Sequence, residues 1–150
     1  MISRFRHSHR RQHASEAYRR IVAQARRPEF FKLCAVPDTI DGRFELICLH
    51  AFLYLRRIKD EPPPAGALGQ YFFDEMFADF DRSLREMGTG DLSVGRHVKR
   101  MAQSFYGRIQ AYESGLAKGD SVLHAALQRN LFGTASATEP VLATMADYLR

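Results

Sequence analysis

The stretch 43–59 constrains the fold more than any other part of this sequence. Its apolar side chains recur at helical spacing and cover most of the helix circumference, leaving little room for a solvated face. A helix of this kind must be covered by other helices, so we expect it at the centre of a bundle. Its nearly apolar run, 46–55, would be about 15 Å long, half of what a bilayer requires, so no transmembrane helix is expected. The apolar positions are Phe44, Leu46, Ile47, Cys48, Leu49, Ala51, Phe52, Leu53, Leu55 and Ile58.

The remainder of the chain also has helical periodicity and almost no strand pattern. Helices are expected after Ser15 to about residue 26, over about 67–87, after Ser93 to about 117, over 121–130, and after Thr138, with a short helical turn near residues 30–33. Gly88 is suited to end the 67–87 helix in the left-handed conformation. A chain of 150 residues fits one domain. We therefore predict an all-α, single-domain bundle of about six helices, with a basic flexible tail (1–13) ahead of one helical domain (14–150).

Positive charge is concentrated at the amino-terminal end. Residues 1–32 contain nine Lys and Arg against two Glu, a net +7, whereas the whole chain carries +5, so residues 33–150 carry −2. Such a cluster attracts polyanions, either ribosomal RNA or the anionic face of a membrane leaflet; the alternative is a solvated tail that only aids solubility. No apolar stretch follows the first cations, so no secretory signal is expected. The arginines assigned to an anionic surface are Arg4, Arg6, Arg10, Arg11, Arg19 and Arg20.

Searches for a catalytic centre find no complete motif. The sequence has no nucleophile elbow, no phosphate-binding glycine loop followed by Lys, and no Ser, His and Asp set with a recognisable spacing. His9 and His13 have helical spacing, but no further metal ligands accompany them. Cys48 and His50 lie in the apolar helix and are expected to be core residues, the histidine with its hydrogen bonds satisfied. We therefore expect a non-catalytic protein with no metal and no cofactor.

The helix expected after Ser93 breaks a local rule. Four basic residues occupy its first two turns: Arg96, His97, Lys99 and Arg100. The positive end of the helix dipole disfavours exposed cations there by about 0.3–1 kcal/mol each. Either nearby carboxylates compensate, or the cations and the free N–H groups await an anion. Internal pairing is preferred for Arg100, and both alternatives stay open for Arg96 and Lys99. The candidate carboxylates are Asp79, Asp81 and Asp91.

Three longer stretches carry a family resemblance. They are VPDTIDGRFEL (36–46), FDRSLREMGTGDLSV (80–94) and KRMAQSFYGR (99–108), within a similarity that spans about residues 30–130. In these residues the sequence resembles the ubiquinol–cytochrome c chaperone family, and so long an ungapped match is far more specific than any short motif. One departure is Gly95, where many members carry Pro; it puts in doubt only the stiffness of that turn.

The resemblance implies a non-catalytic assembly factor for the cytochrome bc1 complex. Mitochondrial members of the family bind newly made cytochrome b and associate with the mitochondrial ribosome near its tunnel exit, together with a small partner protein. This short chain is similar to the bacterial form, so the expected location is the cytoplasm, peripheral to the inner membrane. The expected partners are cytochrome b and, through the amino-terminal cations, a ribosome or an anionic membrane surface, with no specific DNA.

Two other functions are open from the residues alone. A basic helical RNA- or ribosome-binding domain is one, although the chain lacks the exposed aromatic residues between arginines that base stacking needs. A small enzyme of quinone or lipid metabolism is the other; a convergent buried polar pair would favour it, whereas an open apolar groove would favour the chaperone. For the chaperone, we predict client or partner binding around the start of the 94–117 helix, with Tyr106 as an amphipathic anchor. The predicted residues are Asp91, Arg96, Lys99, Arg100 and Tyr106.

Overall fold

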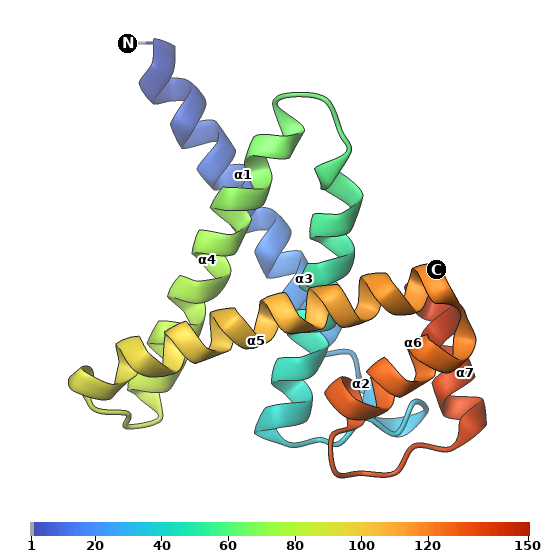
Figure 1. Cartoon of the computed structure of the whole chain (residues 1–150). Helices are drawn as coiled ribbons and strands as arrows, with labels where there is room; N and C mark the ends of the chain where they lie inside the picture. Colours follow the sequence, from blue (N-terminus) through green and yellow to red (C-terminus); the bar gives the residue numbers. More distant parts are fainter. Residues whose placement is uncertain (1) are drawn as a thin grey trace. The chain divides into compact units, whose positions relative to one another are not determined.

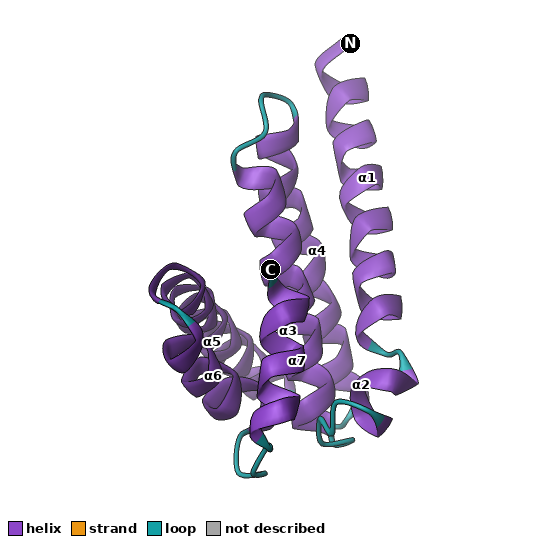
Figure 2. Cartoon of the chain, turned by 90° about the vertical axis from the view of Figure 1, so that its right-hand side faces the viewer, coloured by secondary structure: helices purple, strands orange, loops and turns teal. Residues whose placement is uncertain are grey.

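Helices account for almost all of the chain that the computed structural model describes, which is residues 2–150, with side chains from residue 7 onward. Within this range no residue forms a strand (Figure 2), so the predicted all-α class is confirmed. The described part has seven α-helices (Figure 1), which are the six predicted and the short α2 expected as a helical turn near residues 30–33, and it also has one π-helical segment, η1. In chain order they are α1 (Ile2–Ala25), α2 (Pro28–Lys32), α3 (Ile40–Lys59), α4 (Ala65–Glu86), α5 (Asp91–Lys118), α6 (Asp120–Leu127), η1 (Gln128–Phe132) and α7 (Glu139–Leu149).

Three helices begin earlier than the sequence predicted, and one of them is α3, which begins at Ile40 and not at about Arg43. α1 begins at Ile2 and not after Ser15. Residues 2–13 were expected to form a flexible tail because of their charge, but arginine and glutamine are good helix formers. Along this part of α1, His7 hydrogen-bonds the Tyr71 hydroxyl of α4. α5 begins at Asp91, where an acidic side chain suits the helix dipole. Ser93 therefore does not cap the helix but lies inside it, with its N–H donating to the Gly90 carbonyl at 2.8 Å.

The other predicted helix ends are close to those observed. Gly88 follows α4 with φ 89°, the left-handed conformation expected of it. Thr138 precedes α7 as expected, although its side chain makes no capping hydrogen bond. The helix predicted over 121–130 is divided, since α6 ends at Leu127 and the π-helical segment carries on to Phe132.

The chain forms two compact units, each with its own interior. The first comprises the chain up to Ile21 together with Tyr54–Ser104, and the second comprises Val22–Leu53 and Phe105–Arg150. Helices α1, α3 and α5 each contribute residues to both units. The division that the sequence predicted at residue 13 stays a prediction.

Aromatic side chains hold the first unit together. Tyr18 of α1 is buried, its ring lies edge-on to Phe72 of α4 at 5.8 Å, and its hydroxyl donates to Asp79 Oδ2 at 2.7 Å. Phe72 also stacks on Tyr54, near the end of α3, at 4.5 Å. These contacts place α1 beside α4, as Figure 2 shows. The α4 side of this interior is otherwise built from Met76, Phe77 and Phe80, all of them buried.

The second unit has the larger apolar interior, and α3 is its main contributor. Phe52 is 1% exposed and its ring lies 5.5 Å from that of Tyr112 on α5. Leu46, Cys48 and Leu49 are fully buried, so the apolar helix that the sequence placed at the core is confirmed over its first half. The α6–α7 side of this interior is formed by Leu123, Leu127, Leu142, Met145 and Leu149.

Close backbone approach fixes two glycines in the second unit. A Cβ atom on Gly115 of α5 would lie 2.7 Å from the Leu123 Cα of α6, so only glycine allows the two helices to pack at this distance. Similarly, a Cβ on Gly42 in the first turn of α3 would collide with the Pro37 carbonyl.

No helix within residues 2–150 is long and apolar enough to cross a membrane.

Candidate partner-binding surfaces

At the α4–α5 corner (Figure 1), residues 79–104 of the first unit, arginines of α4 pair with Asp79, Asp81 and Asp91. Arg85 donates through Nε to Asp81 at 2.7 Å and also pairs with Asp91. Arg82 donates to Asp79 at 3.1 Å. These ion pairs occupy the three carboxylates that the sequence offered to the cations Arg96, Lys99 and Arg100 of α5.

Arg96, Lys99 and Arg100 are exposed, and among the described side chains no carboxylate lies within ion-pair distance of any of them. The internal pairing preferred for Arg100 is therefore wrong, because Arg82 and Arg85 have taken the acids that it needed. Spacings of three and four residues put the three cations on one face of α5. We call this face, Arg96, Lys99 and Arg100, the cationic face.

Large apolar side chains are exposed close to the cationic face in sequence. Leu92, one turn before Arg96, is 94% exposed, and Met87 at the end of α4 is 57% exposed. Sequence reasoning missed both, although two apolar residues flanking a Gly-Thr-Gly turn were a visible signal. Tyr106 is 56% exposed, as predicted; it lies further along α5 and belongs to the second unit, apart from the other four predicted residues.

The amino-terminal cations differ in their exposure and in whether a carboxylate pairs with them. Arg19 and Arg20 both pair with Glu16, at 2.5 and 3.0 Å, and these guanidinium groups lower the pKa of that carboxyl. Arg11 is exposed, whereas Arg10 is partly buried. The side chains of Arg4 and Arg6 lie outside the described residues.

A half-buried ion pair in the second unit was missed by sequence reasoning. Glu45 on α3 is 8% exposed and accepts two hydrogen bonds from the Arg108 guanidinium of α5, one of them from Nε at 2.5 Å. The guanidinium also lies over the Phe44 ring, 5.6 Å from its centroid. Burial raises the pKa of the Glu45 carboxyl, and Arg108 opposes that rise. The available signal was an acid beside Leu46 in an apolar helix, which requires a partner.

This ion pair lines a cavity of about 620 Å³. The cavity also contacts Asp41 at the start of α3 and the π-helical segment with the loop after it. A convergent polar pair beside a cavity is the feature expected of a ligand-binding pocket. Here, however, the carboxylate and the guanidinium are bonded to each other.

His50 is a core histidine with satisfied hydrogen bonds, as predicted. It is 3% exposed; Nδ1 lies 2.7 Å from the Leu46 carbonyl and Nε2 lies 2.8 Å from the Tyr148 hydroxyl. This pattern fits a neutral ring with its proton on Nδ1, accepting at Nε2 from Tyr148, whose oxygen accepts in turn from Gln24 at 3.1 Å. Burial lowers the pKa of His50.

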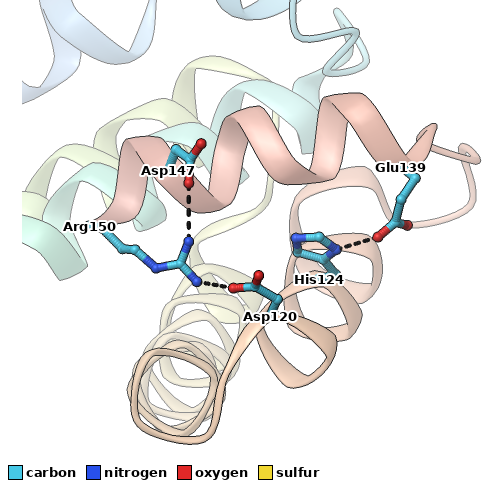
Figure 3. A network of polar contacts seen from close by, with 5 residues as sticks. All are labelled: Asp120, His124, Glu139, Asp147 and Arg150. Carbon is cyan, nitrogen blue, oxygen red and sulfur yellow. Dashed lines mark hydrogen bonds and ion pairs between the residues drawn. The ribbon is translucent and has the colours of Figure 1, made fainter.

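Polar contacts tie α7 to α6 at the carboxyl end of the second unit. Arg150 pairs with Asp147 of its own segment at 3.1 Å and with Asp120 at the start of α6, and His124 Nδ1 lies 2.7 Å from Glu139 (Figure 3). These charges serve the packing of α7 on α6. Among the side chains from residue 7 onward, no three His, Cys, Asp or Glu residues gather as a metal site would require.

Comparison with known proteins identifies the family of this chain. A sequence model of the ubiquinol–cytochrome c chaperone family matches residues 32–150. The chain is 30% identical over 122 residues to ubiquinol–cytochrome-c reductase complex assembly factor 1 of Xenopus laevis, covering 81% of this chain and 61% of that protein. The human protein of that name is 29% identical over 122 residues, which are 41% of its length. The chain thus spans roughly two-fifths to three-fifths of these relatives.

A solved structure agrees over nearly the whole chain. The crystal structure of the Cbp3 homolog from Brucella abortus aligns with a TM-score of 0.82 and 39% sequence identity, covering 99% of this chain and 84% of that one. The family resemblance of residues 36–46 and 80–108 is therefore confirmed by both sequence and structure. On this basis, the chain belongs to the ubiquinol–cytochrome c chaperone family.

Proposed function

We propose that the chain is a non-catalytic assembly chaperone of the cytochrome bc1 complex and that its client is the newly made cytochrome b subunit. The observation that carries the proposal is the family match over residues 32–150, supported by relatives named as assembly factors of that complex. Cytochrome b enters through the family resemblance. A protein that binds and releases an assembling subunit needs accessible contact surfaces and no reacting groups, and exposed unpaired cations beside exposed apolar side chains suit that task.

The proposed client or partner contacts are the cationic face with Asp91 in the first unit and, as a separate contact, Tyr106 in the second unit. Leu92 and Met87 supply apolar area beside the cations, and Tyr106 offers an aromatic anchor with a polar tip. Exposed charges contribute long-range attraction and orientation, whereas apolar contacts contribute most of the affinity.

The amino-terminal cations are proposed to meet an anionic surface, either a ribosome or the inner membrane, with the chain peripheral to that membrane on its cytoplasmic side. Arg11 supports this role, since it is exposed and no described carboxylate pairs with it. Arg19 and Arg20 support it less strongly because both share Glu16.

One observation favours a second candidate, a small-ligand pocket or enzyme. The Glu45–Arg108 pair lines a cavity of about 620 Å³. We rank this function second because Glu45 and Arg108 satisfy each other's hydrogen bonds. Neither group is directed at a third functional side chain that would act as nucleophile or base. The Glu45→Gln variant separates the two, because an enzyme should lose its activity, whereas a chaperone should retain bc1 assembly if it remains folded.

Capture of the client tests the proposal. Tagged full-length chain is recovered from detergent-solubilised membranes of cells making bc1 complex, and co-purifying proteins are identified by mass spectrometry. We expect cytochrome b to be enriched with wild-type chain and depleted with Arg96→Glu/Lys99→Glu. A chain whose deletion leaves bc1 levels normal, and which captures no bc1 subunit, would not be such a chaperone.

A further inference from the structure

A second apolar surface with charges at its edge lies in the second unit and shares no lining residue with the cavity of about 620 Å³. A cavity of about 440 Å³ opens between the end of α1, α2 and the start of α3. Its apolar lining is Phe31, Ile47 and Pro28, of which Phe31 and Ile47 are half-buried and pack on the core. This volume lies within the roughly 300–1,000 Å³ of typical ligand sites. We call this cavity, with its lining residues, the α2–α3 groove.

The edge of the α2–α3 groove is cationic. Arg26, Lys32 and Arg43 line it with one acid, Asp38, which accepts from Arg43 Nε at 2.7 Å. Arg26 and Lys32 are exposed, and within the described part of the chain no carboxylate lies at ion-pair distance from either. Two positive charges are thus available to an anionic group that enters beside the apolar lining.

Two exposed apolar side chains are close in sequence to residues that line the groove. Leu33, directly after α2, is 75% exposed, and Ile40, the first residue of α3, is 70% exposed. Between them Ala35 has φ 53°, a left-handed conformation that is unfavourable for a residue with a Cβ. The next residue fixes the loop, because the Val36 N–H donates to the Phe30 carbonyl at 3.0 Å. The loop is therefore held in this conformation despite the cost to Ala35.

We infer that the α2–α3 groove binds an acidic, amphipathic segment of a partner polypeptide. Apolar side chains of the segment enter against Phe31, and its Asp or Glu side chains meet Arg26 and Lys32. A bilayer surface is engaged by convex amphipathic faces and not by a concave cavity. Single-stranded nucleic acid is bound through bases stacked on exposed aromatic side chains, whereas Phe31 is half-buried. The inference does not depend on cytochrome b as the client, since the groove lies in a different unit from the cationic face.

A designed peptide tests this inference with the full-length chain. The probe is a fluorescein-labelled peptide of Leu and Glu, with Leu at the i, i+3, i+4 and i+7 spacing of an amphipathic helix. Binding is followed by fluorescence anisotropy at low and physiological salt. The groove variant is Arg26→Glu/Lys32→Glu. The matched control is Lys118→Glu/Arg129→Glu, which makes the same change in net charge at exposed positions of the same unit, outside the groove.

We expect the groove variant to bind the probe at least about tenfold more weakly than wild type, and the control to change binding by less than about threefold. Leu33→Ser should also weaken binding, and a probe with Lys in place of Glu should not bind. The melting temperatures of all variants should change only slightly, since the altered side chains are exposed; the largest change is expected for the control, which removes the cation from the last turn of α5. Equal losses in groove and control variants, or no binding of the probe to wild type, would overturn the inference. The inference would also be overturned if phosphatidylglycerol vesicles or RNA displaced the probe and Arg26→Glu/Lys32→Glu abolished the binding of those polyanions.

Discussion

At the α4–α5 corner, Arg96, Lys99 and Arg100 are exposed to solvent and the nearby acids belong to other arginines, whereas in the second unit Glu45 and Arg108 bond each other below the surface. His50 of the second unit is likewise enclosed by partners. Folding thus pairs these polar groups of the second unit with one another, and it leaves the three cations at the corner without a carboxylate partner. The difference indicates which substitutions should cost stability and which should cost only partner binding.

The largest effect is expected in the apolar interior of the second unit. Phe52→Ala should lower the free energy of unfolding by about 3–5 kcal/mol, because a buried ring is lost and a cavity remains. Leu92→Ala at the corner, where the side chain is 94% exposed, should change it by less than about 0.5 kcal/mol. Urea denaturation followed by circular dichroism measures both. Similar values for the two would remove the distinction between interior and corner.

A smaller loss is expected when the half-buried ion pair is broken. Arg108→Met should lower stability by about 2–4 kcal/mol, because Glu45 would be left near its buried position without a cation. Replacing both residues, as Arg108→Met/Glu45→Leu, should recover much of that loss, because no uncompensated charge is left behind. The same denaturation experiment, arranged as a double-mutant cycle, checks this. If the double variant is as unstable as Arg108→Met, the pair is not the reason for the loss.

The sequence predicted apolar packing far better than it predicted polar pairing. Phe52 and Cys48 were placed in the core because helical periodicity reports burial directly. Arg100 was assigned a carboxylate that Arg85 holds instead, because sequence distance alone does not tell which of several cations reaches an acid first. Arg108 was overlooked for the same reason: its partner Glu45 lies 63 residues away in the chain. The α2–α3 groove depends on a loop conformation that local patterns do not encode.

The histidine network should make stability depend on pH. Burial lowers the pKa of His50 from its ordinary 6.5, so between the two values the unfolded chain holds a proton that the folded chain lacks. Stability should therefore fall as the pH is lowered through 6.5, by at most about 1.4 kcal/mol per pH unit. His50→Gln, which has no titrating group, should show a shallower dependence between about pH 5 and 7 in urea denaturation. Identical slopes for the two proteins would mean that other groups cause the acid sensitivity.

The smallest effect on stability, and a large one on function, is expected at the cationic face. Arg96→Glu/Lys99→Glu should leave the melting temperature nearly unchanged, because both side chains are exposed and lie in the second and third turns of α5, beyond the first turn where the helix dipole acts most strongly. Reversal at the other end of the same helix, Lys118→Glu, should lower it slightly, since a cation suits the last turn. Assembled bc1 complex, measured in membranes by native electrophoresis, should fall with the double variant and stay normal with Lys118→Glu. A double variant with a clearly lowered melting temperature would show that the cationic face is structural. A stable double variant with normal bc1 levels would show that the cationic face is not needed for assembly. Only retained stability together with lost assembly would indicate that folding does not use these charges and that a partner requires them.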